Sequence, residues 1–194
     1  MNRLLRALAL LALVAGCGSR NFQSPRGIDD ACAIVAQHGS YLRAFRAAER
    51  QWGVPVPVQM AIIYQESKFI GNARTPHQYA LGVIPIGRQS SAYGYAQALD
   101  ATWAEYQRAE GGSGARRDNI RDATDFMGWY MSQTTEELGI PLSDTRNQYL
   151  AYHEGRTGYA RGSYRSKGWL VTIAAELAAR ANMYEAQLRA CRRL

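Results

Sequence analysis

Apolar residues recur at the spacing of an amphipathic helix through most of this sequence, and polar or glycine-rich stretches separate the helical segments. A glycine follows each of the inner helical segments within a few residues, as is typical of helix ends. The pattern predicts helices over residues 29–51, 58–67, 100–110, 118–138 and 144–154, and a long amphipathic helix from residue 167 onward. No stretch sustains the alternation of a strand, so the sequence predicts a single, mainly α domain.

The segment between the second and third predicted helices is different. Residues 71–93 contain Pro76, Pro85 and three glycines among polar side chains. Proline and glycine interrupt regular structure, so we expect a loop with at most a short extended piece. A second irregular stretch is expected at residues 159–164, shortly before the C-terminal helix.

The first sixteen residues have the pattern of an export signal. Arg3 and Arg6 precede an apolar run over residues 7–15, and small residues end it. The run is much shorter than the roughly 20 residues that a bilayer-spanning helix needs. We therefore interpret residues 1–16 as a signal peptide that is not part of the fold.

Residues 13–16, Leu-Val-Ala-Gly, stand directly before Cys17, and this arrangement resembles the lipobox of bacterial lipoproteins. In that class the cysteine is lipidated and becomes the mature N-terminus. An ordinary signal peptide followed by an incidental cysteine is the alternative. Gly18 follows instead of Asp, so the resemblance implies a lipid anchor in the outer membrane, facing the periplasm. We expect a tether over residues 17–27 and the folded domain over residues 28–194.

Composition and charge then limit the class of protein. Of the 194 residues, 47% are hydrophobic, which is too many for a disordered chain. The net charge of +7 first suggests a nucleic-acid partner. Loss of Arg3 and Arg6 with the signal peptide lowers this charge to +5, and an exported protein rarely meets nucleic acid. The remaining charge suits an anionic membrane or an acidic cell-wall polymer, with an ordinary solvated face as the alternative.

Two cysteines remain in the mature chain, Cys32 and Cys191. An even pair outside the cytoplasm is a candidate disulfide. Each lies on an apolar stripe at helical spacing, one in the first predicted helix and one in the last. We expect a disulfide that ties these two helices together; two separate buried thiols are the alternative.

Several common catalytic and cofactor motifs are absent from the sequence, namely GxSxG, the Walker loop, GxGxxG and CxxC. His153 and Glu154 begin like the zinc motif HExxH, but Thr157 occupies the position of the second histidine. The sequence therefore implies neither a metal nor a cofactor.

The most informative segment is residues 60–69, Met-Ala-Ile-Ile-Tyr-Gln-Glu-Ser-Lys-Phe. On a helix, Glu66 follows Ile62 by four residues and Ile63 by three, so its carboxyl faces the apolar side. It also lies near the helix C-terminus, where the macrodipole disfavours a negative charge. Both effects raise the pKa of a carboxyl and let it serve as a general acid near neutral pH. A half-exposed glutamate in the last helical turn is the alternative.

Three short motifs follow one another in an order that resembles the soluble-lytic-transglycosylase (SLT) domain family. Glu66-Ser67 matches the ES of that family, residues 94–97 (Gly-Tyr-Ala-Gln) match its GLMQ, and residues 151–155 (Ala-Tyr-His-Glu-Gly) match its AYNxG. The motif region covers residues 57–164, just over half of the chain. The resemblance implies a lysozyme-like α fold, within the mainly α class expected from the pattern.

Two of these motifs depart from the family pattern, because Tyr95 and Ala96 replace Leu and Met, and His153 replaces Asn. The resemblance implies that Glu66 is the catalytic residue. It also implies substrate contacts from the neighbouring serine and from the other two motifs: Ser67, Gly94, Tyr95, Gln97, Tyr152 and His153. Ser67 can equally cap the helix, and Tyr152 can equally be a packed core aromatic.

The activity that the resemblance implies is cleavage of the β-1,4 bond between N-acetylmuramic acid and N-acetylglucosamine in peptidoglycan. Glu66 would protonate the leaving oxygen and then take the proton of the muramoyl 6-hydroxyl, which closes a 1,6-anhydro ring. Two alternatives stay open. A goose-type lysozyme-like hydrolase would need a second carboxylate about 6.5–9.5 Å from the acid, with Asp100 and Glu154 as candidates. A non-catalytic peptidoglycan-binding or scaffold lipoprotein is the other.

Aromatic residues are numerous enough to line a sugar-binding groove, since flat rings stack on pyranose faces. Three tryptophans on predicted helical stripes are expected in the core: Trp52, Trp129 and Trp169. Three tyrosines in or near residues 71–93 are better candidates for the groove: Tyr79, Tyr93 and Tyr95. This segment can close over a glycan, with disorder as the alternative.

Overall fold

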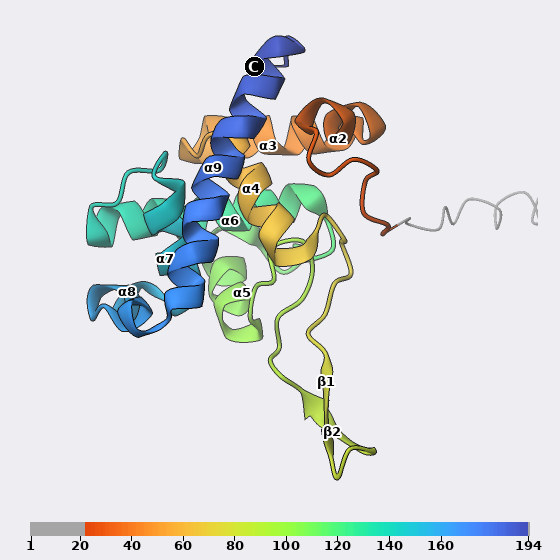
Figure 1. The fold of residues 1–194 in the computed structure, drawn as a ribbon, viewed down its shortest axis with the longest axis vertical. Helices are drawn as coiled ribbons and strands as arrows, with labels where there is room; N and C mark the ends of the chain where they lie inside the picture. Colours follow the sequence, from red (N-terminus) through yellow and green to blue (C-terminus); the bar gives the residue numbers. More distant parts are fainter. Residues whose placement is uncertain (1–21, 194) are drawn as a thin grey trace, which may run out of the picture.

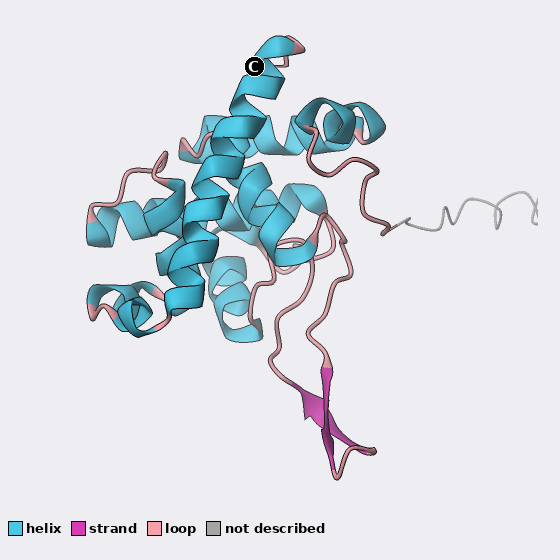
Figure 2. Ribbon diagram, viewed as in Figure 1, coloured by secondary structure: helices cyan, strands magenta, loops and turns pink. Residues whose placement is uncertain are grey.

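The computed structural model describes residues 22–193. The predicted signal peptide, residues 1–16, and the predicted lipidation site, Cys17, lie outside the described residues. Helices dominate the described part, and its strands are confined to one hairpin (Figure 2). The helices are α2 (Ala31–Gln37), α3 (Gly39–Trp52), α4 (Val56–Ser67), α5 (Asp100–Tyr106), α6 (Ile120–Leu138), α7 (Thr145–Glu154), α8 (Arg156–Ala160) and α9 (Gly168–Ala190). The predicted mainly α fold is confirmed.

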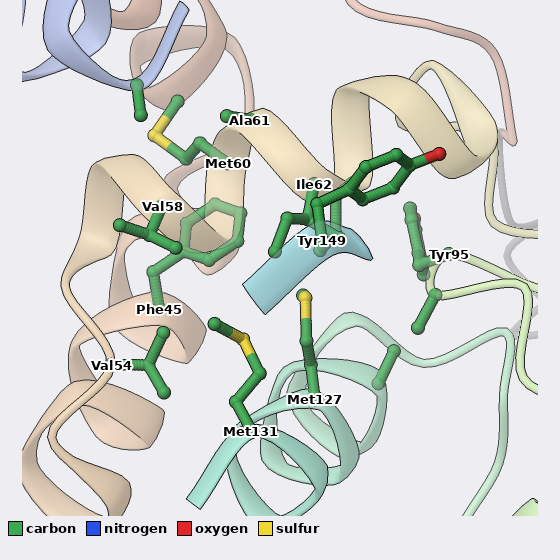
Figure 3. Close-up of a cluster of buried hydrophobic side chains, with 14 of the residues drawn as sticks. Phe45, Val54, Val58, Met60, Ala61, Ile62, Tyr95, Met127, Met131 and Tyr149 are labelled. Atoms are coloured by element: carbon green, nitrogen blue, oxygen red, sulfur yellow. The ribbon is translucent and has the colours of Figure 1, made fainter. Parts of the chain in front are cut away.

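Helix α4 lies at the centre of the helical body. Helix α9 runs along α4 and α7, and α3 packs on α6 (Figure 1). The α4 sequence, VPVQMAIIYQES, is apolar on nearly every side, which suits a helix enclosed by others. Met60, Ala61 and Ile62 are fully buried, and side chains from α3, α6 and α7 meet around them (Figure 3).

Local sequence signals set several helix ends. Asp30 and Asp144 cap α2 and α7, because their carboxylates accept hydrogen bonds from backbone N–H groups of the first turn. Gly53 and Gly139 end α3 and α6 with φ of 78° and 69°, a left-handed conformation that favours glycine. The predicted helix end at Gly139 is therefore confirmed.

Two predicted helices are divided in the structure. The helix expected over residues 29–51 is broken at His38, whose φ of −130° and ψ of 78° are not helical. Gly39, a poor helix former, follows and begins α3. The helix expected over residues 100–110 is α5 followed by a wider π-helical turn, η1 (Gln107–Gly111). The irregular stretch expected at residues 159–164 contains the end of α8 and the start of a 3₁₀ turn, η2 (Ser163–Ser166).

The segment expected to be a loop, residues 71–93, contains the hairpin of β1 (His77–Ala80) and β2 (Ile84–Arg88). The strands pair antiparallel, with His77 opposite Arg88 and Ala80 opposite Ile84. Pro85 has no N–H to donate, but each strand of a two-stranded ribbon has an open edge, so β2 tolerates it. The hairpin projects away from the helical body (Figure 1).

The first and last helices of the described chain are linked covalently. Cys32 and Cys191 form a disulfide with Cα atoms 6.3 Å apart, the pairing expected from the sequence. Beside it, the side chain of Gln187 accepts a hydrogen bond from the Ala31 N–H and donates one to the Asp29 carbonyl. Segments separated by 159 residues are thus held together at one end of α9.

The described part of the predicted tether, residues 22–27, lies on the domain. Ser24 Oγ donates a hydrogen bond to the Lys68 carbonyl at 2.7 Å. The ring of Phe22 lies so close to Gly71 that a Cβ at Gly71 would be 2.6 Å from it. The chain therefore enters the domain beside the base of the hairpin.

Candidate active site

The last turn of α4 presents Glu66 at the edge of the core. Helix α4 ends sharply, because Lys68 and Phe69 both adopt left-handed backbone conformations, with φ of 51° and 62°. Such conformations cost free energy in non-glycine residues and occur often at functional sites. Phe69 is fully buried and fixes the chain at this turn. The turn therefore holds Glu66 in place.

Glu66 is partly buried, and the pKa of its carboxyl is higher than that of an ordinary glutamate. Burial raises the pKa of Glu66 to about 7 from an ordinary value of 4.5, although a hydrogen bond with Tyr149 and the charge of Lys68 act in the opposite direction. The position of Glu66 at the C-terminal end of α4 also disfavours a negative charge. A carboxyl of this kind keeps its proton near neutral pH and can donate it to a ligand.

Helix α7 places two tyrosines beside Glu66. Tyr149 shares a hydrogen bond with Glu66, and burial and the Glu66 charge raise the pKa of both Tyr149 and Tyr152. The Tyr152 hydroxyl donates a hydrogen bond to the Ala96 carbonyl at 2.6 Å. Tyr149 belongs to none of the three sequence motifs and was not predicted as a site residue. The signal was its position three residues before Tyr152, which puts both side chains on one face of a helix.

Gly94 and Gln97 shape the loop that Tyr152 contacts. Gly94 has a φ of 84°, and a Cβ there would lie 2.1 Å from the Arg117 carbonyl oxygen, so only glycine fits. Gln97 has a φ of 47°. Its Nε2 donates hydrogen bonds to the carbonyls of Ala73 and Gly94 at 3.0 and 2.8 Å. The amide of Gln97 therefore fixes the conformation of this loop.

A groove of about 230 Å³ brings the second and third sequence motifs together. Its lining comes from this loop and from α5, α6 and α7: Gln97, Ala98, Leu99, Thr102, Phe126, Tyr130, Tyr152, His153, Glu154 and Gly155. Tyr152 packs edge-on against Tyr130, with ring centroids 5.3 Å apart. Glu66 itself is not among the lining residues, but burial and the Glu66 charge raise the pKa of Tyr152, which is one of them. A larger hollow of about 480 Å³ between α4 and α9 contains none of the motif residues.

Three of the predicted substrate contacts, Ser67, Gly94 and Tyr95, are buried and do not line the groove. Ser67 is buried, and its hydroxyl donates to the Ile63 carbonyl at 3.3 Å, which is the helix-end role left open by the sequence. Tyr95 is buried in the core, and its hydroxyl lies 3.2 Å from that of Tyr41. The Tyr95 ring therefore fills the core and does not line the groove, so its position does not support the predicted substrate contact.

His153 and Glu154 line the groove, and Glu154 is held in a polar network. Burial acts to raise the pKa of Glu154, but hydrogen bonds from Lys167, Ser163 and His153 outweigh it and hold the pKa at about 2. Lys167 Nζ is 2.7 Å from one carboxylate oxygen, and the Glu154 side chain is only 4% exposed. Glu154 is therefore a permanently ionised carboxylate and a weak base.

The tryptophans divide between the core and the surface. Trp129 is buried as expected, and Trp52 is partly buried. Trp169 is 56% exposed, so the expectation of a core position is wrong. It lies in the first turn of α9, where its ring centroid is 5.4 Å from that of His153 at the groove. Trp169 thus offers an exposed flat ring beside the groove.

The remaining tyrosine candidates lie away from this groove. Tyr79 is exposed on the hairpin. The ring of Tyr93 is covered by the guanidinium of Arg74, whose central carbon is 4.2 Å from the ring centroid. Neither ring contributes to the groove lining.

Two kinds of feature are missing from the part of the chain that the structure describes. Within residues 22–193, no three His, Cys, Asp or Glu side chains gather in an arrangement that could hold a metal ion. In the same range, no helix combines the length and the apolar character needed to cross a membrane.

Comparison with known proteins identifies the family. A search among curated proteins finds no match to this chain. The family described as a transglycosylase SLT domain matches residues 5–191, which is nearly the whole chain. It is the family that the three motifs resemble, and its lysozyme-like fold agrees with the observed helical body. The chain therefore belongs to the transglycosylase SLT domain family.

Proposed function

We propose that this protein is a lytic transglycosylase that cleaves the β-1,4 bond between N-acetylmuramic acid and N-acetylglucosamine in peptidoglycan. Membership of the SLT family supports peptidoglycan as the substrate. The observation that carries the proposal is Glu66, a carboxyl whose pKa burial raises to about 7. Tyr149 is hydrogen-bonded to it, and burial and the Glu66 charge also raise the pKa of Tyr152, which lines the groove. This is the property that an acid acting near neutral pH requires.

In the proposed reaction Glu66 acts twice. Its protonated carboxyl gives the proton to the oxygen of the departing N-acetylglucosamine as the glycosidic bond breaks. The resulting carboxylate takes the proton of the muramoyl 6-hydroxyl, whose oxygen bonds to the anomeric carbon and closes the 1,6-anhydro ring. Glu66 ends each turnover protonated, as it began. One carboxyl suffices because the nucleophile belongs to the substrate.

Hydrolysis is less well supported, because it needs a second carboxylate to activate water. Glu154 has a low pKa and is engaged by Lys167, Ser163 and His153, so it is a poor base. Asp100 is exposed and forms an ion pair with Arg117 at 2.7 Å. Glu154 is thus held in a polar network and Asp100 in an exposed ion pair.

Product masses test the proposed reaction. Peptidoglycan digested by this protein is expected to yield muropeptides that end in 1,6-anhydromuramic acid, lighter by one water than hydrolysis products and without a reducing end. Mass spectrometry of the soluble products measures this directly. Products with reducing ends would identify a hydrolase. Sacculi that bind the protein but release nothing would identify a non-catalytic scaffold.

The pH profile is expected to report the acidity of Glu66. Because Glu66 must begin each turnover protonated, kcat/KM should stay level below pH about 7 and fall above it. Tyr149→Phe removes the hydrogen bond that lowers the pKa of Glu66, so the falling limb should move to higher pH. The measurement is kcat/KM on glycan strands across this range, with Tyr164→Phe as the matched control. If the fall of kcat/KM occurs at the same pH in Tyr149→Phe, a group other than Glu66 causes the pH dependence.

We propose further that the mature chain begins at a lipidated Cys17 and is anchored to the outer membrane, facing the periplasm. The basic and apolar pattern of residues 1–16 supports export. The Cys32–Cys191 disulfide suits an oxidising compartment. Mass spectrometry of the mature N-terminus tests the anchor, and an unmodified Cys17 would contradict it.

A further inference from the structure

The β1–β2 hairpin carries an exposed apolar surface that the proposed activity does not use. Leu81 and Val83, on either side of Gly82 at the turn, are 90% and 76% exposed, and Ile86 is 63% exposed. Tyr79 and Ile84 are exposed as well. The helical body does not cover these side chains, because the hairpin projects away from it (Figure 1). An exposed apolar cluster of this kind indicates a contact surface.

The apolar side chains lie on both faces of the hairpin. Successive residues of a strand point to opposite faces, whereas directly paired residues point to the same face. Ile84 pairs with Ala80, the neighbour of Tyr79, so Tyr79 and Ile84 lie on opposite faces. A folded protein partner would cover one face and leave the other in water. The apolar interior of a lipid bilayer can surround both faces of the hairpin.

Charge around the hairpin favours an anionic surface. No Asp or Glu occurs between Glu66 and Asp100, whereas Lys68, Arg74 and Arg88 all lie in this stretch. Arg88 ends β2 at the base of the hairpin and donates a hydrogen bond to the Thr75 carbonyl at 2.6 Å. The hairpin therefore has an apolar tip and a basic base, the order in which a membrane presents its hydrocarbon and its anionic headgroups.

The position of the N-terminal segment places the same side of the domain near a membrane. Phe22 lies against Gly71 at the base of the hairpin, and Cys17 is five residues earlier. Five residues reach at most about 18 Å. If Cys17 carries the proposed lipid, this short reach keeps the hairpin base close to the bilayer. Only this step depends on the proposed lipid anchor. The arguments from the exposed apolar side chains and from the basic residues of the hairpin do not depend on it.

We propose that the β1–β2 hairpin is a membrane-binding element that inserts its apolar tip into the interface of a bilayer containing anionic lipid. Its basic base contacts the headgroups. If the hairpin reaches its maximum extension of about 36 Å over the twelve residues from Gly71 to Gly82, it would lie obliquely to the bilayer, because the segment from Cys17 to Phe22 spans at most about 18 Å. The domain then has two membrane contacts, which fix the orientation of its groove as well as its distance from the lipid.

A local fluorescent probe on the full chain tests this. In Cys17→Ser, with Cys32 and Cys191 in their disulfide, Leu81→Cys supplies the reactive thiol for an environment-sensitive NBD label. Vesicles of equal parts phosphatidylglycerol and phosphatidylcholine are expected to increase its emission about threefold or more and to shift it to the blue. The matched control is a label at Ala175→Cys, on an exposed position of α9, which should not respond. Adding Ile84→Ser and Ile86→Ser should abolish most of the response at position 81.

Three outcomes would overturn the proposal. The first is no response at position 81 while the chain sediments with the vesicles. The second is an equal response with phosphatidylcholine alone, which would remove the role of anionic lipid. The third is a response without vesicles that grows with protein concentration, which would assign the hairpin to a second copy of the chain. None of these measurements involves peptidoglycan, so they stand apart from the test of the proposed reaction.

Discussion

Glu66→Gln is expected to lower kcat/KM on peptidoglycan about 10³-fold, because the amide can neither donate the proton nor take it back. The loss should appear mainly in kcat, since Gln has nearly the same shape and the groove residues are unchanged. Release of soluble muropeptides from sacculi measures the rate. Clearance by Glu66→Gln at the rate of the unmodified protein would show that another group supplies the acid.

The matched control for this variant is Glu136→Gln, an exposed glutamate of α6 outside the groove, which should keep full activity. Stability provides a second control. The pKa of Glu66 is raised on folding, so the folded state loses stability as pH rises from about 4.5 towards 7, up to about 3 kcal/mol. Gln has no proton to lose. Glu66→Gln should therefore be at least as stable as the unmodified chain at neutral pH, and more stable above it.

Loss of the Cys32–Cys191 disulfide is expected to lower the free energy of unfolding by about 3–5 kcal/mol, because the bond joins two cysteines that are 159 residues apart in the sequence and so closes a long loop in the unfolded chain. This is a large part of the roughly 5–15 kcal/mol that holds a typical domain together. Denaturant unfolding of the oxidised chain and of Cys32→Ala/Cys191→Ala measures the difference. Buried tryptophans such as Trp129 provide the fluorescence signal.

A reductant provides the control for the disulfide. It should destabilise the unmodified chain by the same amount and leave the double variant unchanged. The hydrogen bonds of Gln187 to residues 29 and 31 remain without the disulfide, so the helical content should persist in the absence of denaturant. A difference below about 1 kcal/mol would mean that these noncovalent contacts alone align the first and last helices.

Helix positions could be predicted from the sequence wherever one face is apolar and a glycine or a capping residue marks an end. Helix α6 is an example, with its end at Gly139. The break at His38 could not be predicted, because the apolar spacing continues across it and the break appears only in the backbone conformation of His38. For the hairpin segment only a loop with a possible short extended piece was predicted, because Pro85 and Gly82 indicate a loop and the apolar side chains of the hairpin have no core to face.

The apolar spacing before Glu66 predicted the raised pKa of its carboxyl. Three residues of the predicted site, Gln97, Tyr152 and His153, line one groove, whereas Glu66 is not among the lining residues. The roles of these residues stay predictions. The contacts of individual residues depend on where their side chains point, and the spacing of residues along the sequence does not determine this. Tyr95 follows Gly94 directly, and yet its side chain is buried in the core. Tyr149 lies outside every motif, and yet it forms a hydrogen bond with Glu66.

The burial of α4 has a consequence for how the protein loses function. A helix enclosed by α9 and the core cannot open by itself, because its exposure would require most of the domain to unfold. Glu66 lies in the last turn of that helix, next to the buried residues Ser67 and Phe69, so we expect its surroundings to be lost mainly through global unfolding. The hairpin packs on little and can open locally at small cost. The proposed catalytic carboxyl and the hairpin proposed to bind a membrane therefore lie in the most stable and the least stable parts of the same domain.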